Sequence, residues 1–296
     1  MEFERGLVSI ISINYNSLNY TLQMIKSLDL STYKNIEIVL VDNGSTDDPA
    51  DALSPIDKVT YVRSDKNLGF AGGNNIGIKY SKGEYLFFVN NDTEFTPTLI
   101  QDLLNTLHSN VKVGLVSPKI IYYGTQTIQF AGYTEISNLT GRNKALGNKK
   151  EDSPDYQNLI NSPYAHGAAM MTTRSVVEKC GRMPEIYFLY YEELDWCEKI
   201  RSAGYEILVN RSTYIFHKES MSVGKNSPLK TYYLTRNRLL FFRRNKRKLE
   251  RMVFYLYFYL LVFPIKSITG TFKGEWQHLK SFWKGVFWHF TNSPNG

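Results

Sequence analysis

Short apolar runs rich in β-branched residues alternate with stretches of helical periodicity along the first ninety residues. The runs predict four strands, over residues 7–13, 36–41, 59–62 and 85–89. Residues 72–80 predict one helix, and apolar side chains at helical spacing predict another between the first two strands: Tyr20, Met24, Ile25 and Leu28. Strands that alternate with helices indicate an α/β fold with a mostly parallel sheet and helices on both faces. In such folds, ligands bind at the carboxyl ends of the strands.

The predicted strands end in polar residues that suit a binding site. Asn14 and Asn16 follow the first strand, Asp42 follows the second, and Asp92 follows the fourth. A carboxylate such as Asp42 can accept hydrogen bonds from a nucleoside base or from ribose hydroxyls, and Asp92 can ligate a hard cation. Each aspartate also has a structural interpretation. Asp42 opens a turn sequence, Asp-Asn-Gly-Ser-Thr, and Asp92 can cap a helix predicted over residues 95–107.

A third acidic group lies in the C-terminal half, within aromatic surroundings. Glu192, Glu193 and Asp195 follow the run Tyr-Phe-Leu-Tyr-Tyr at residues 187–191. Apolar walls raise the pKa of a carboxyl group towards neutrality, which suits a general base. The alternative is a solvated acidic turn that opens a helix over residues 194–202, because acids favour helix N-termini.

Three other features have both a functional and a structural interpretation. The glycine-rich stretch 67–75 permits a close backbone approach to an anion, although such a stretch is also ordinary turn chemistry. His217 ends an apolar run, where a lone histidine is either a metal ligand or a structural residue. Arg236, next to Asn237, carries a guanidinium fork that suits a diphosphate.

Composition limits the class of protein. With 296 residues, 43% of them hydrophobic, the chain can bury a full core and fits one large α/β domain with an appendage. It has two cysteines, and residues 1–6 carry two glutamates and no apolar segment. We therefore expect no disulfide framework, no zinc site, no signal peptide and a cytoplasmic location. A net charge of +7 fits either nucleic acid or an anionic membrane, so its position matters.

The positive charge is concentrated near the C-terminus, beside an apolar segment. Eight basic residues fall within positions 236–251, and the 14 residues 252–265 are apolar and rich in aromatics. At about 1.5 Å per residue this segment spans about 21 Å, less than the roughly 30 Å hydrocarbon core of a bilayer. Pro264 and Lys266 are expected to interrupt it. The segment is therefore expected not to cross a membrane alone.

Residues 276–290 repeat tryptophan, phenylalanine and leucine at helical spacing, with lysines between them. This pattern is typical of an amphipathic helix that lies in a bilayer surface. We expect a catalytic domain over residues 1–245 and a membrane-association region over residues 246–296. The alternative is a pair of core helices packed on the domain. No nucleic-acid-binding signature accompanies the basic run, so we expect no nucleic acid partner.

The ordered set of motifs resembles the family 2 inverting glycosyltransferases of GT-A fold, and within them the bacterial rhamnosyltransferase-like branch that builds surface polysaccharides. The resemblance covers roughly residues 7–245, and its specificity lies in the order because each motif alone is weak. The motifs are Asn14-Tyr-Asn16, Val41-Asp-Asn-Gly-Ser-Thr46, Asn67-Leu-Gly-Phe-Ala-Gly-Gly-Asn-Asn75, Asn90-Asn-Asp92, His166-Gly-Ala168, Tyr191-Glu-Glu-Leu-Asp-Trp196 and His217.

The resemblance implies a role for each motif. It implies that Asp92 and His217 hold a divalent cation, Mg²⁺ or Mn²⁺, although Asn90 replaces the first acid of the family's D-x-D motif. Glu193 is the expected base; the family more often has aspartate there, so Asp195 is the reserve. His166 is expected to line the acceptor site. We expect nine residues to bind the nucleotide-sugar: Asn14, Asn16, Asp42, Asn67, Gly69, Gly72, Asn75, Asn91 and Arg236.

By this resemblance, we expect an inverting glycosyltransferase that is peripheral on the inner face of the cell membrane. It would move a sugar from a dTDP- or UDP-sugar to a lipid-linked glycan acceptor. Two alternatives are a nucleotidyltransferase on a similar sheet and a catalytically silent nucleotide-sugar-binding assembly protein. The acidic cluster at residues 192–195 has no role in the first alternative, whereas Asn90 favours the second. Neither the sugar nor the linkage follows from the sequence.

Overall fold

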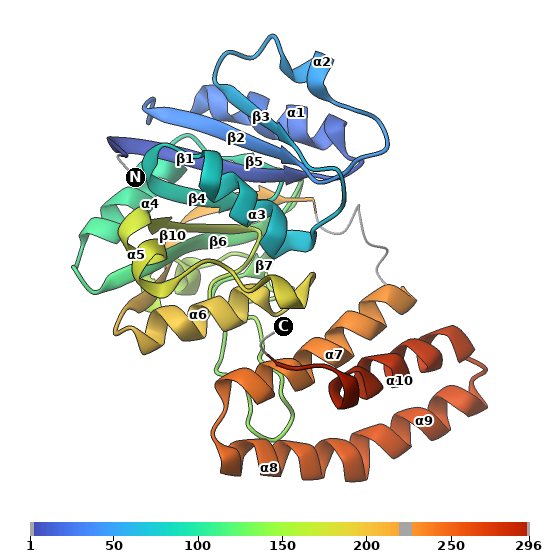
Figure 1. The fold of residues 1–296 in the computed structure, drawn as a ribbon. Coiled ribbons are helices and arrows are strands. Elements are labelled where there is room, and N and C mark those ends of the chain that lie inside the picture. Colours follow the sequence, from blue (N-terminus) through green and yellow to red (C-terminus); the bar gives the residue numbers. More distant parts are fainter. Residues whose placement is uncertain (1–2, 219–226, 295–296) are drawn as a thin grey trace.

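The computed structural model describes residues 3–218 and 227–294, which form a ten-stranded sheet with helices on both faces (Figure 1). The strands are β1 (Glu4–Asn14), β2 (Ile36–Asp42), β3 (Val59–Arg63), β4 (Gly83–Val89), β5 (Thr93–Phe95), β6 (Val113–Tyr122), β7 (Ile128–Phe130), β8 (Leu159–Asn161), β9 (Ala169–Thr173) and β10 (Glu206–His217). The helices of the sheet domain are α1 (Leu18–Ser27), α2 (Ala50–Leu53), α3 (Gly69–Tyr80), α4 (Leu99–His108), α5 (Arg174–Cys180) and α6 (Glu192–Ser202), with short 3-10 turns η1 (Leu28–Leu30), η2 (Pro154–Tyr156) and η3 (Glu185–Tyr187).

The sheet is parallel in its first half and mixed in its second. The strand order is β3-β2-β1-β4-β9-β6-β10-β5, with β7 beside β6 and β8 beside β10. Strands β1 to β4 are mutually parallel, as the sequence predicts, and Asn14 lies opposite Asp42 in the register. Strand β9 runs antiparallel to both β4 and β6. The polar ends of β1, β2 and β4 therefore meet at one edge.

Strand side chains alternate between two cores, one on each face of the sheet. Ile11 and Phe88 pack with α3, α5, α6 and α7 (Pro228–Asn245) on one face. Ile10 and Phe87, their direct neighbours in sequence, pack with α1, α2 and α4 on the other. This period of two follows from the pleat of a strand. It gives the three-layer arrangement in Figure 1.

The segment after Asp92 differs from the sequence-based prediction. Residues Thr93–Phe95 form the short strand β5, antiparallel to the end of β10, and helix α4 begins only at Leu99. Asp92 is therefore not a helix cap, and that structural interpretation was wrong. Pairing with β10 instead places Asp92 beside His217.

The C-terminal helices also differ from the prediction. Helix α8 (Lys248–Tyr257), the π-helical turn η4 (Phe258–Val262) and α9 (Phe263–Phe272) form one continuous helix of 25 residues, so Pro264 and Lys266 do not interrupt it. Proline removes an N–H and crowds the preceding turn, and the wider π turn just before Pro264 accommodates both effects. At about 1.5 Å per residue the helix is about 37 Å long. It is therefore long and apolar enough to cross a membrane, with 11% of its most apolar window buried, although core helices of soluble proteins share this length and composition.

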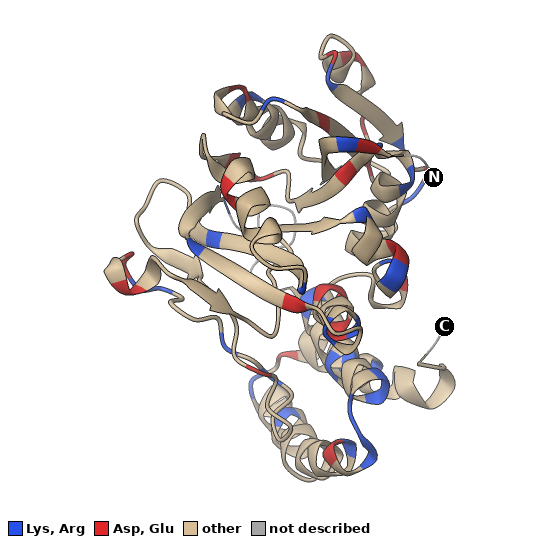
Figure 2. Cartoon of the chain, turned by 90° about the vertical axis from the view of Figure 1, so that its left-hand side faces the viewer, with Lys and Arg blue, Asp and Glu red and all other residues tan. Residues whose placement is uncertain are grey.

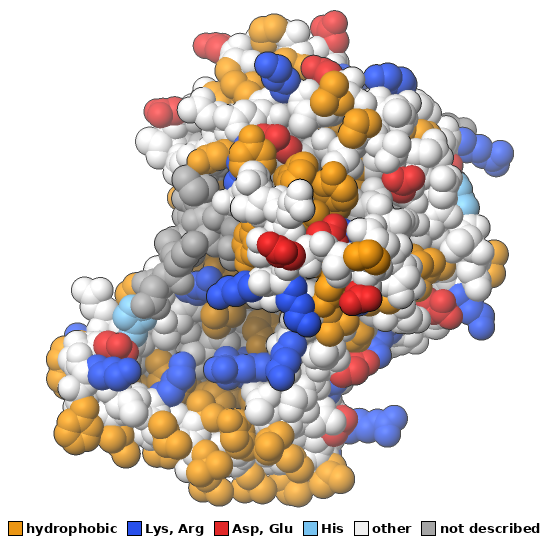
Figure 3. Space-filling view, turned by 180° about the vertical axis from the view of Figure 1, so that it is seen from behind, with side chains coloured by type: hydrophobic (Ala, Val, Ile, Leu, Met, Phe, Trp, Pro, Cys, Tyr) orange, Lys and Arg blue, Asp and Glu red, His pale blue; other side chains and the backbone are white. Residues whose placement is uncertain are grey.

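The last helix, α10 (Trp276–Thr291), turns back and packs along α7. Leu279, Phe282 and Val286 are buried in this contact, whereas Trp276 and Phe290 are exposed. Lys and Arg recur along the C-terminal helices (Figure 2), and a space-filling view shows an apolar surface below them (Figure 3). The exposed apolar residues of the long helix are Leu249, Met252, Val253, Leu256, Tyr259, Leu260, Leu261, Ile265, Ile268 and Phe272.

Candidate active site

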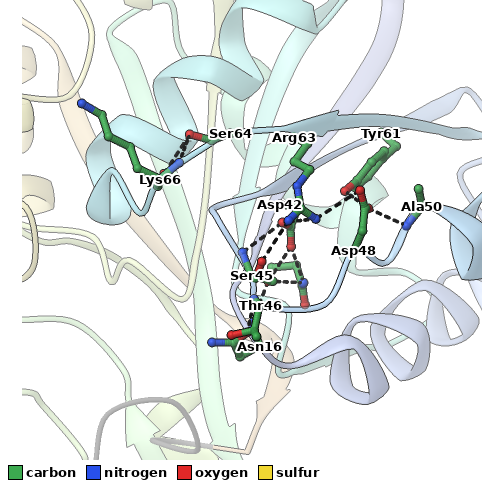
Figure 4. Close-up of polar contacts among 11 residues, drawn as sticks. Asn16, Asp42, Ser45, Thr46, Asp48, Ala50, Tyr61, Arg63, Ser64 and Lys66 are labelled. Carbon is green, nitrogen blue, oxygen red and sulfur yellow. Dashed lines mark hydrogen bonds and ion pairs between the residues drawn. The ribbon is translucent and has the colours of Figure 1, made fainter.

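Asp42 ends β2 and is fully buried, with both carboxylate oxygens engaged (Figure 4). Its Oδ1 accepts hydrogen bonds from Asn14 Nδ2 at 2.8 Å and from Ser45 Oγ at 2.5 Å. Its Oδ2 accepts from the Ser45 N–H at 3.1 Å and lies 3.4 Å from the Arg63 guanidinium, which also pairs with Asp48. The carboxylate thus holds the loops after β1 and β2 together. This arrangement includes the turn that was the structural alternative for Asp42.

A cavity of about 340 Å³ opens in front of Asp42. Asn14, Asn16 and Ser45 line it. Asn14 and Ser45 also donate hydrogen bonds to Asp42, which lies behind this wall and does not line the cavity. Asn16 has a positive φ of 51°, and its Oδ1 accepts a hydrogen bond from the Thr46 N–H. The other lining residues are Ser17, Leu18, Asn19, Tyr20, Asp47, Asp48 and Pro49. Two of the predicted nucleotide residues therefore form the cavity wall, and Asp42 supports it.

The glycine-rich stretch forms the first turns of α3 and packs against other backbone. Asn67 accepts a hydrogen bond from Asn43 Nδ2 at 3.1 Å, which ties the stretch to the loop after β2. At Gly69, with φ of 72°, a Cβ would lie 2.0 Å from the carbonyl oxygen of Phe188, and at Gly72 a Cβ would lie 2.6 Å from Leu68 Cβ. Only glycine permits these approaches. Gly69 thus lets the backbone pack against Phe188, and Gly72 lets it pack against Leu68.

Asn75 and Asn91 bond to other parts of the protein. Asn75 Nδ2 donates to the Met183 carbonyl at 2.9 Å and to Glu185 at 2.8 Å. Asn91 Nδ2 donates to Ser17 Oγ at 2.7 Å and to Thr21 at 2.8 Å. Asn75 thus fixes the segment before η3, while Asn91 joins the end of β4 to the start of α1, next to the cavity.

The structure brings Asp92 and His217 together across 125 positions of sequence. Asp92 Oδ1 lies 3.1 Å from His217 Nε2, and Asn90 Nδ2 lies 3.4 Å from the same nitrogen. The other ring nitrogen, Nδ1, lies 2.8 Å from Oε1 of the buried Gln129. A proton on Nδ1 that is donated to Gln129 leaves the Nε2 lone pair facing Asp92. This carboxylate and imidazole are the ligand pair expected for the cation.

Among the described residues, no three or more His, Cys, Asp or Glu side chains form a complete metal-binding group. A pair of protein ligands is nevertheless what Mg²⁺ or Mn²⁺ needs beside a diphosphate, because such ions keep waters and take phosphate oxygens as further ligands. The donor set of one carboxylate, one neutral imidazole and the neighbouring Asn90 amide therefore fits a cation bound together with a nucleotide diphosphate.

Two adjacent glutamates begin α6, beside the turn after residue 165. The pKa of Glu193 is raised to about 7, mainly because burial disfavours the charged carboxylate. The pKa of Glu192 is raised well above its ordinary value, first by burial and then by the charge of Glu193. Near neutral pH, Glu193 is therefore a carboxyl that can both release and accept a proton. A carboxyl group with a pKa near neutrality suits a general base.

His166 and Gly167 connect the Glu193 side to the cation pair. A Cβ on Gly167 would lie 3.9 Å from Glu193 Cγ, and the His166 ring centroid lies 6.3 Å from that of His217. His166 Nδ1 accepts a hydrogen bond from the Ala168 N–H, so its proton is on Nε2. Burial lowers the pKa of His166 to about 3, and the ring is neutral at physiological pH. A neutral donor is thus placed between the predicted base and the predicted cation ligands.

Two predicted site residues are engaged elsewhere. Asp195 is fully buried and accepts hydrogen bonds from Tyr187 and Asn245, and it forms a 2.8 Å ion pair with Arg244. The Arg236 guanidinium donates to the carbonyl oxygens of Ile186 at 2.7 Å and Tyr187 at 2.6 Å. Asp195 thus joins α6 to α7, and Arg236 holds the backbone of the loop before α6. The predicted roles of Asp195 as reserve base and of Arg236 as diphosphate ligand stay predictions.

Arg236 and its neighbour Asn237 hold an unusual loop. Asn237 Nδ2 donates to the carbonyls of residues 187, 189 and 190. In this loop Phe188, Tyr190 and Tyr191 have positive φ angles of 64°, 68° and 78°, a conformation that non-glycine residues rarely adopt. Hydrogen bonds from Arg236 and Asn237 of α7 hold the loop before Glu193 in this strained conformation.

Several residues of the site were not identified from the sequence. Gln129, which orients His217, lies inside the short apolar strand β7, and a polar residue in such a run was a usable signal. Ser45 and Arg63 complete the surroundings of Asp42. Asn43 bonds to residues 67–69 through both ends of its amide. These roles depend on tertiary contacts that one sequence does not reveal.

Comparison with known proteins identifies this arrangement. A model of the family described as Glycosyl transferase family 2 matches residues 9–181, more than half of the chain. The chain belongs to glycosyl transferase family 2. This family 2 glycosyltransferase is 30% identical over 240 residues to the low-salt glycan biosynthesis hexosyltransferase Agl10 of Haloferax volcanii. The aligned segment covers 79% of this chain and 74% of that protein. It is 28% identical over 231 residues to the dTDP-rhamnosyl transferase RfbF of Shigella flexneri, 72% of each chain.

The fold of this glycosyltransferase also matches solved structures. The mannosyltransferase PcManGT of Pyrobaculum calidifontis, solved in complex with GDP-Man and Mn²⁺, has a TM-score of 0.58, covering 97% of this chain and 75% of that one at 14% sequence identity. The GT-A fold and the rhamnosyltransferase-like relationship expected from the sequence are therefore confirmed.

Proposed function

We propose that this glycosyltransferase inverts the sugar's anomeric configuration by a single displacement, with Glu193 as the general base. The observation that carries the proposal is Glu193 itself: its pKa is raised to about 7, and it lies beside Gly167, next to His166, whose ring centroid is 6.3 Å from that of His217. In-line displacement needs a base that faces the acceptor hydroxyl while the leaving group departs on the other side. Glu193 would take the proton of that hydroxyl.

The donor is proposed to be a dTDP- or UDP-sugar. The nucleoside would occupy the cavity lined by Asn14, Asn16 and Ser45, with Asp42 holding this wall in place. Similarity to a dTDP-rhamnosyl transferase supports a deoxythymidine or uridine donor. A pyrimidine ring and ribose present the hydroxyl and imide groups that amides and hydroxyls can bind.

Asp92 and His217 are proposed to hold Mg²⁺ or Mn²⁺ against the donor diphosphate. When bound, the cation would neutralise charge on the departing nucleoside diphosphate. Gln129 Oε1 lies 2.8 Å from Nδ1 and so favours the tautomer with the lone pair on Nε2, and Asn90, whose amide nitrogen lies 3.4 Å from Nε2, could act as a further ligand through its oxygen if the amide turned. Asn90 in place of an acid thus reduces the charge of the pair without removing its ligand chemistry.

The acceptor is proposed to be a lipid-linked glycan used in surface polysaccharide synthesis, reached on the cytoplasmic face of the membrane. The basic C-terminal helices and their exposed apolar residues, among them Leu260 and Ile265, support contact with an anionic bilayer. We retain residues 1–245 as the catalytic domain and 246–296 as the membrane-association region. Because α10 packs on α7, the second region is anchored on the first.

The test of the proposed function replaces Glu193 with glutamine, which keeps the shape but cannot accept a proton. We expect Glu193→Gln to lose at least about 100-fold in turnover while binding UDP and Mn²⁺ with unchanged affinity, since general base catalysis contributes roughly 10²–10⁴-fold. The exposed Glu178→Gln on α5 is the matched control. Near-normal turnover of Glu193→Gln would remove Glu193 as the base, and a wild-type protein that binds the donor without hydrolysing or transferring it would favour the silent alternative.

A further inference from the structure

A second and larger cavity, of about 730 Å³, lies between the sheet domain and the C-terminal helices. One wall is the segment of residues 134–144, which leaves the sheet after β7, and the other wall is formed by α7, α8 and η4. Its lining residues are Thr134, Glu135, Ser137, Thr140, Arg142, Asn143, Lys144, Arg238, Tyr257 and Val262. None of the sequence-predicted site residues belongs to it.

The cavity gathers positive charge. Arg142, Lys144 and Arg238 line it, while its one acidic residue, Glu135, is paired with Arg201 at 2.5 Å. The charge of Arg238 lowers the pKa of Arg142, and burial together with Arg238 and Arg142 lowers the pKa of Lys266. Like charges held this close cost free energy until an anion joins them. A ligand of opposite charge would therefore balance the cluster.

Two polar atoms of this wall also lack partners. Nδ2 of Asn143 and Nε of Arg238 are buried and make no hydrogen bond within the described chain. A buried donor without an acceptor costs about 1–3 kcal/mol, so such atoms are few in folded proteins. Both belong to residues that line the cavity. These donors lie within the wall rather than on its surface, so an acceptor oxygen from a ligand would reach them only by entering the wall.

The far wall of the cavity is apolar and continues into the exposed helix surface. Tyr257 and Val262 close the cavity, and the same helix exposes Leu260, Leu261 and Ile265 to the outside. In Figure 3 the apolar surface lies next to a row of basic side chains. The anionic head of a ligand could thus contact the basic residues of the cavity, and its alkyl chain could contact the apolar side of the adjoining helix.

The cavity is also connected to the proposed base. Tyr191, two residues before Glu193, donates from its hydroxyl to the Gly141 carbonyl at 3.2 Å. Burial raises the pKa of Tyr191, and the nearby charges of Arg238 and Arg142 partly offset this rise. Tyr133 precedes the lining residue Thr134, and the charge of Glu193 contributes, after burial, to the raised pKa of Tyr133. Tyr191 and Tyr133 therefore connect the segment that forms one cavity wall with the surroundings of Glu193.

We infer that this cavity binds the phosphate or diphosphate head group of an acceptor carried on an alkyl chain, through Arg142, Asn143 and Arg238. The inference rests on the proposed function, because it places the acceptor's carrier relative to Glu193. It assigns the head group to residues that are distinct from the Asp92–His217 pair, so the acceptor is bound without the donor's cation. The alkyl chain leaves along η4 towards the exposed surface of the long helix.

The test is a calorimetric titration of the full chain with undecyl diphosphate in neutral detergent, with EDTA present so that the cation pair does not contribute. We expect Arg142→Gln and Arg238→Gln each to weaken binding about ten-fold or more, because a hydrogen bond to a charged group is worth about 1.5–3 kcal/mol. Arg5→Gln, an exposed arginine at the start of β1, is the control and should bind as the wild type does. UDP affinity with Mn²⁺ reports that each variant is folded.

Two control ligands are titrated in the same detergent. Undecanol tests the contribution of the alkyl chain alone, and phosphatidylglycerol tests whether an ordinary anionic lipid binds equally well. We expect both to bind about ten-fold or more weakly than undecyl diphosphate, and we expect both variants to lose this preference. Equal affinity for phosphatidylglycerol would make the cavity a lipid headgroup site and overturn the diphosphate assignment. Wild-type affinity in both variants, or an equal loss in Arg5→Gln, would overturn the site itself. Dependence of turnover on Glu193 is measured separately, so failure of this inference leaves the proposed function standing.

Discussion

Glu192 and Glu193 are adjacent in sequence but differ in what surrounds their carboxyl groups. Glu192 is 3% exposed and one of its oxygens has no hydrogen-bond partner, which favours the protonated form. Glu193 receives hydrogen bonds from backbone N–H groups at the start of α6, and these partly offset the effect of burial. Of the two carboxyl groups, Glu193, with a pKa of about 7, is therefore the one suited to exchange a proton near neutral pH.

The pH dependence of catalysis follows from Glu193. Its pKa is raised to about 7, so below that pH it carries a proton and cannot accept the proton of the acceptor. We expect kcat/KM to rise about ten-fold per pH unit up to about pH 7 and then to level off. Glu192→Gln should keep a rise of kcat/KM with pH, because the Glu193 carboxyl remains. A profile that is flat between pH 5.5 and 8 would contradict the assignment.

Gln129 is expected to control metal affinity without touching the metal. Gln129→Met keeps the volume but removes the acceptor of His217 Nδ1–H, so the imidazole loses its fixed orientation. We expect Mn²⁺ to bind about 10- to 100-fold more weakly in the presence of UDP, measured by the free Mn²⁺ signal in electron paramagnetic resonance. Gln126→Met, exposed three residues earlier, is the control. Unchanged Mn²⁺ affinity in Gln129→Met would show that Gln129 does not orient the imidazole.

At this scale the sequence predicted side chains whose positions follow from strand ends, and missed those set by packing. Asp92 and His217 each follow an apolar run, and the antiparallel pairing of β5 with β10 brings them together. Arg236 was predicted as a diphosphate ligand because an arginine fork fits phosphate. It fits the carbonyls of the loop before α6 equally well, and only the position of α7 decides between them.

Among the elements, the start of α3 packs directly against the loop after η3, and a Cβ at Gly69 would come within 2.0 Å of that loop's backbone. Gly69 has φ of 72°, and its Cβ would overlap the Phe188 carbonyl, while Gly124 has φ of 71° with open space around it. Both Gly69→Ala and Gly124→Ala incur the cost of a left-handed residue, about 1 kcal/mol. Gly69→Ala should lower the free energy of unfolding by about 1–3 kcal/mol more, measured by urea denaturation. Equal losses in the two variants would show that the loop can move aside.

The boundaries of strands and helices could be predicted where local propensity sets them, but not where tertiary contacts set them. Residues 36–42 and 83–89 form strands close to their predicted ranges because their apolar runs are short, β-branched or aromatic, and bounded by turns. A helix was predicted to begin at Phe95, but residues 93–95 pair with the edge of β10 and form a strand. Pro264 reads as a helix end, and a π turn just before it lets the helix continue.

For the whole molecule, the sequence predicted the GT-A fold but not the packing of its tail. The alternation of strands and helices established the parallel half of the sheet, while antiparallel β9 enters after a long excursion that has no periodic signal. The two interpretations of the tail, core helices or surface helices, each describe part of it. Helix α10 packs on α7 through Leu279 and Phe282, whereas the long helix keeps an apolar side exposed.

The exposed side makes a prediction about membrane binding. Leu260 is 68% exposed, so Leu260→Gln together with Ile265→Gln should leave the melting temperature unchanged but reduce sedimentation with phosphatidylglycerol vesicles about five-fold or more. The control is Leu30→Gln, a leucine of the sheet domain that is 67% exposed. High salt should release the full chain only partly, because salt screens the basic residues but not apolar burial. Vesicle binding that is unaffected by the double substitution would exclude the helix as the contact.

The contact between Gly69 and residue 188 has a consequence for how such enzymes can be recombined. Gly69 lies within residues 9–181, which the family model matches, while Phe188 lies beyond them in the loop that leads to the base. The Phe70 N–H donates to the Phe188 carbonyl at 2.8 Å, so the two parts meet backbone to backbone, without side chains between them. A chimera that joins this N-terminal part to the C-terminal part of a relative therefore needs a glycine at position 69 and a left-handed loop opposite it, in addition to matched side-chain pairs such as Asn75 with Glu185.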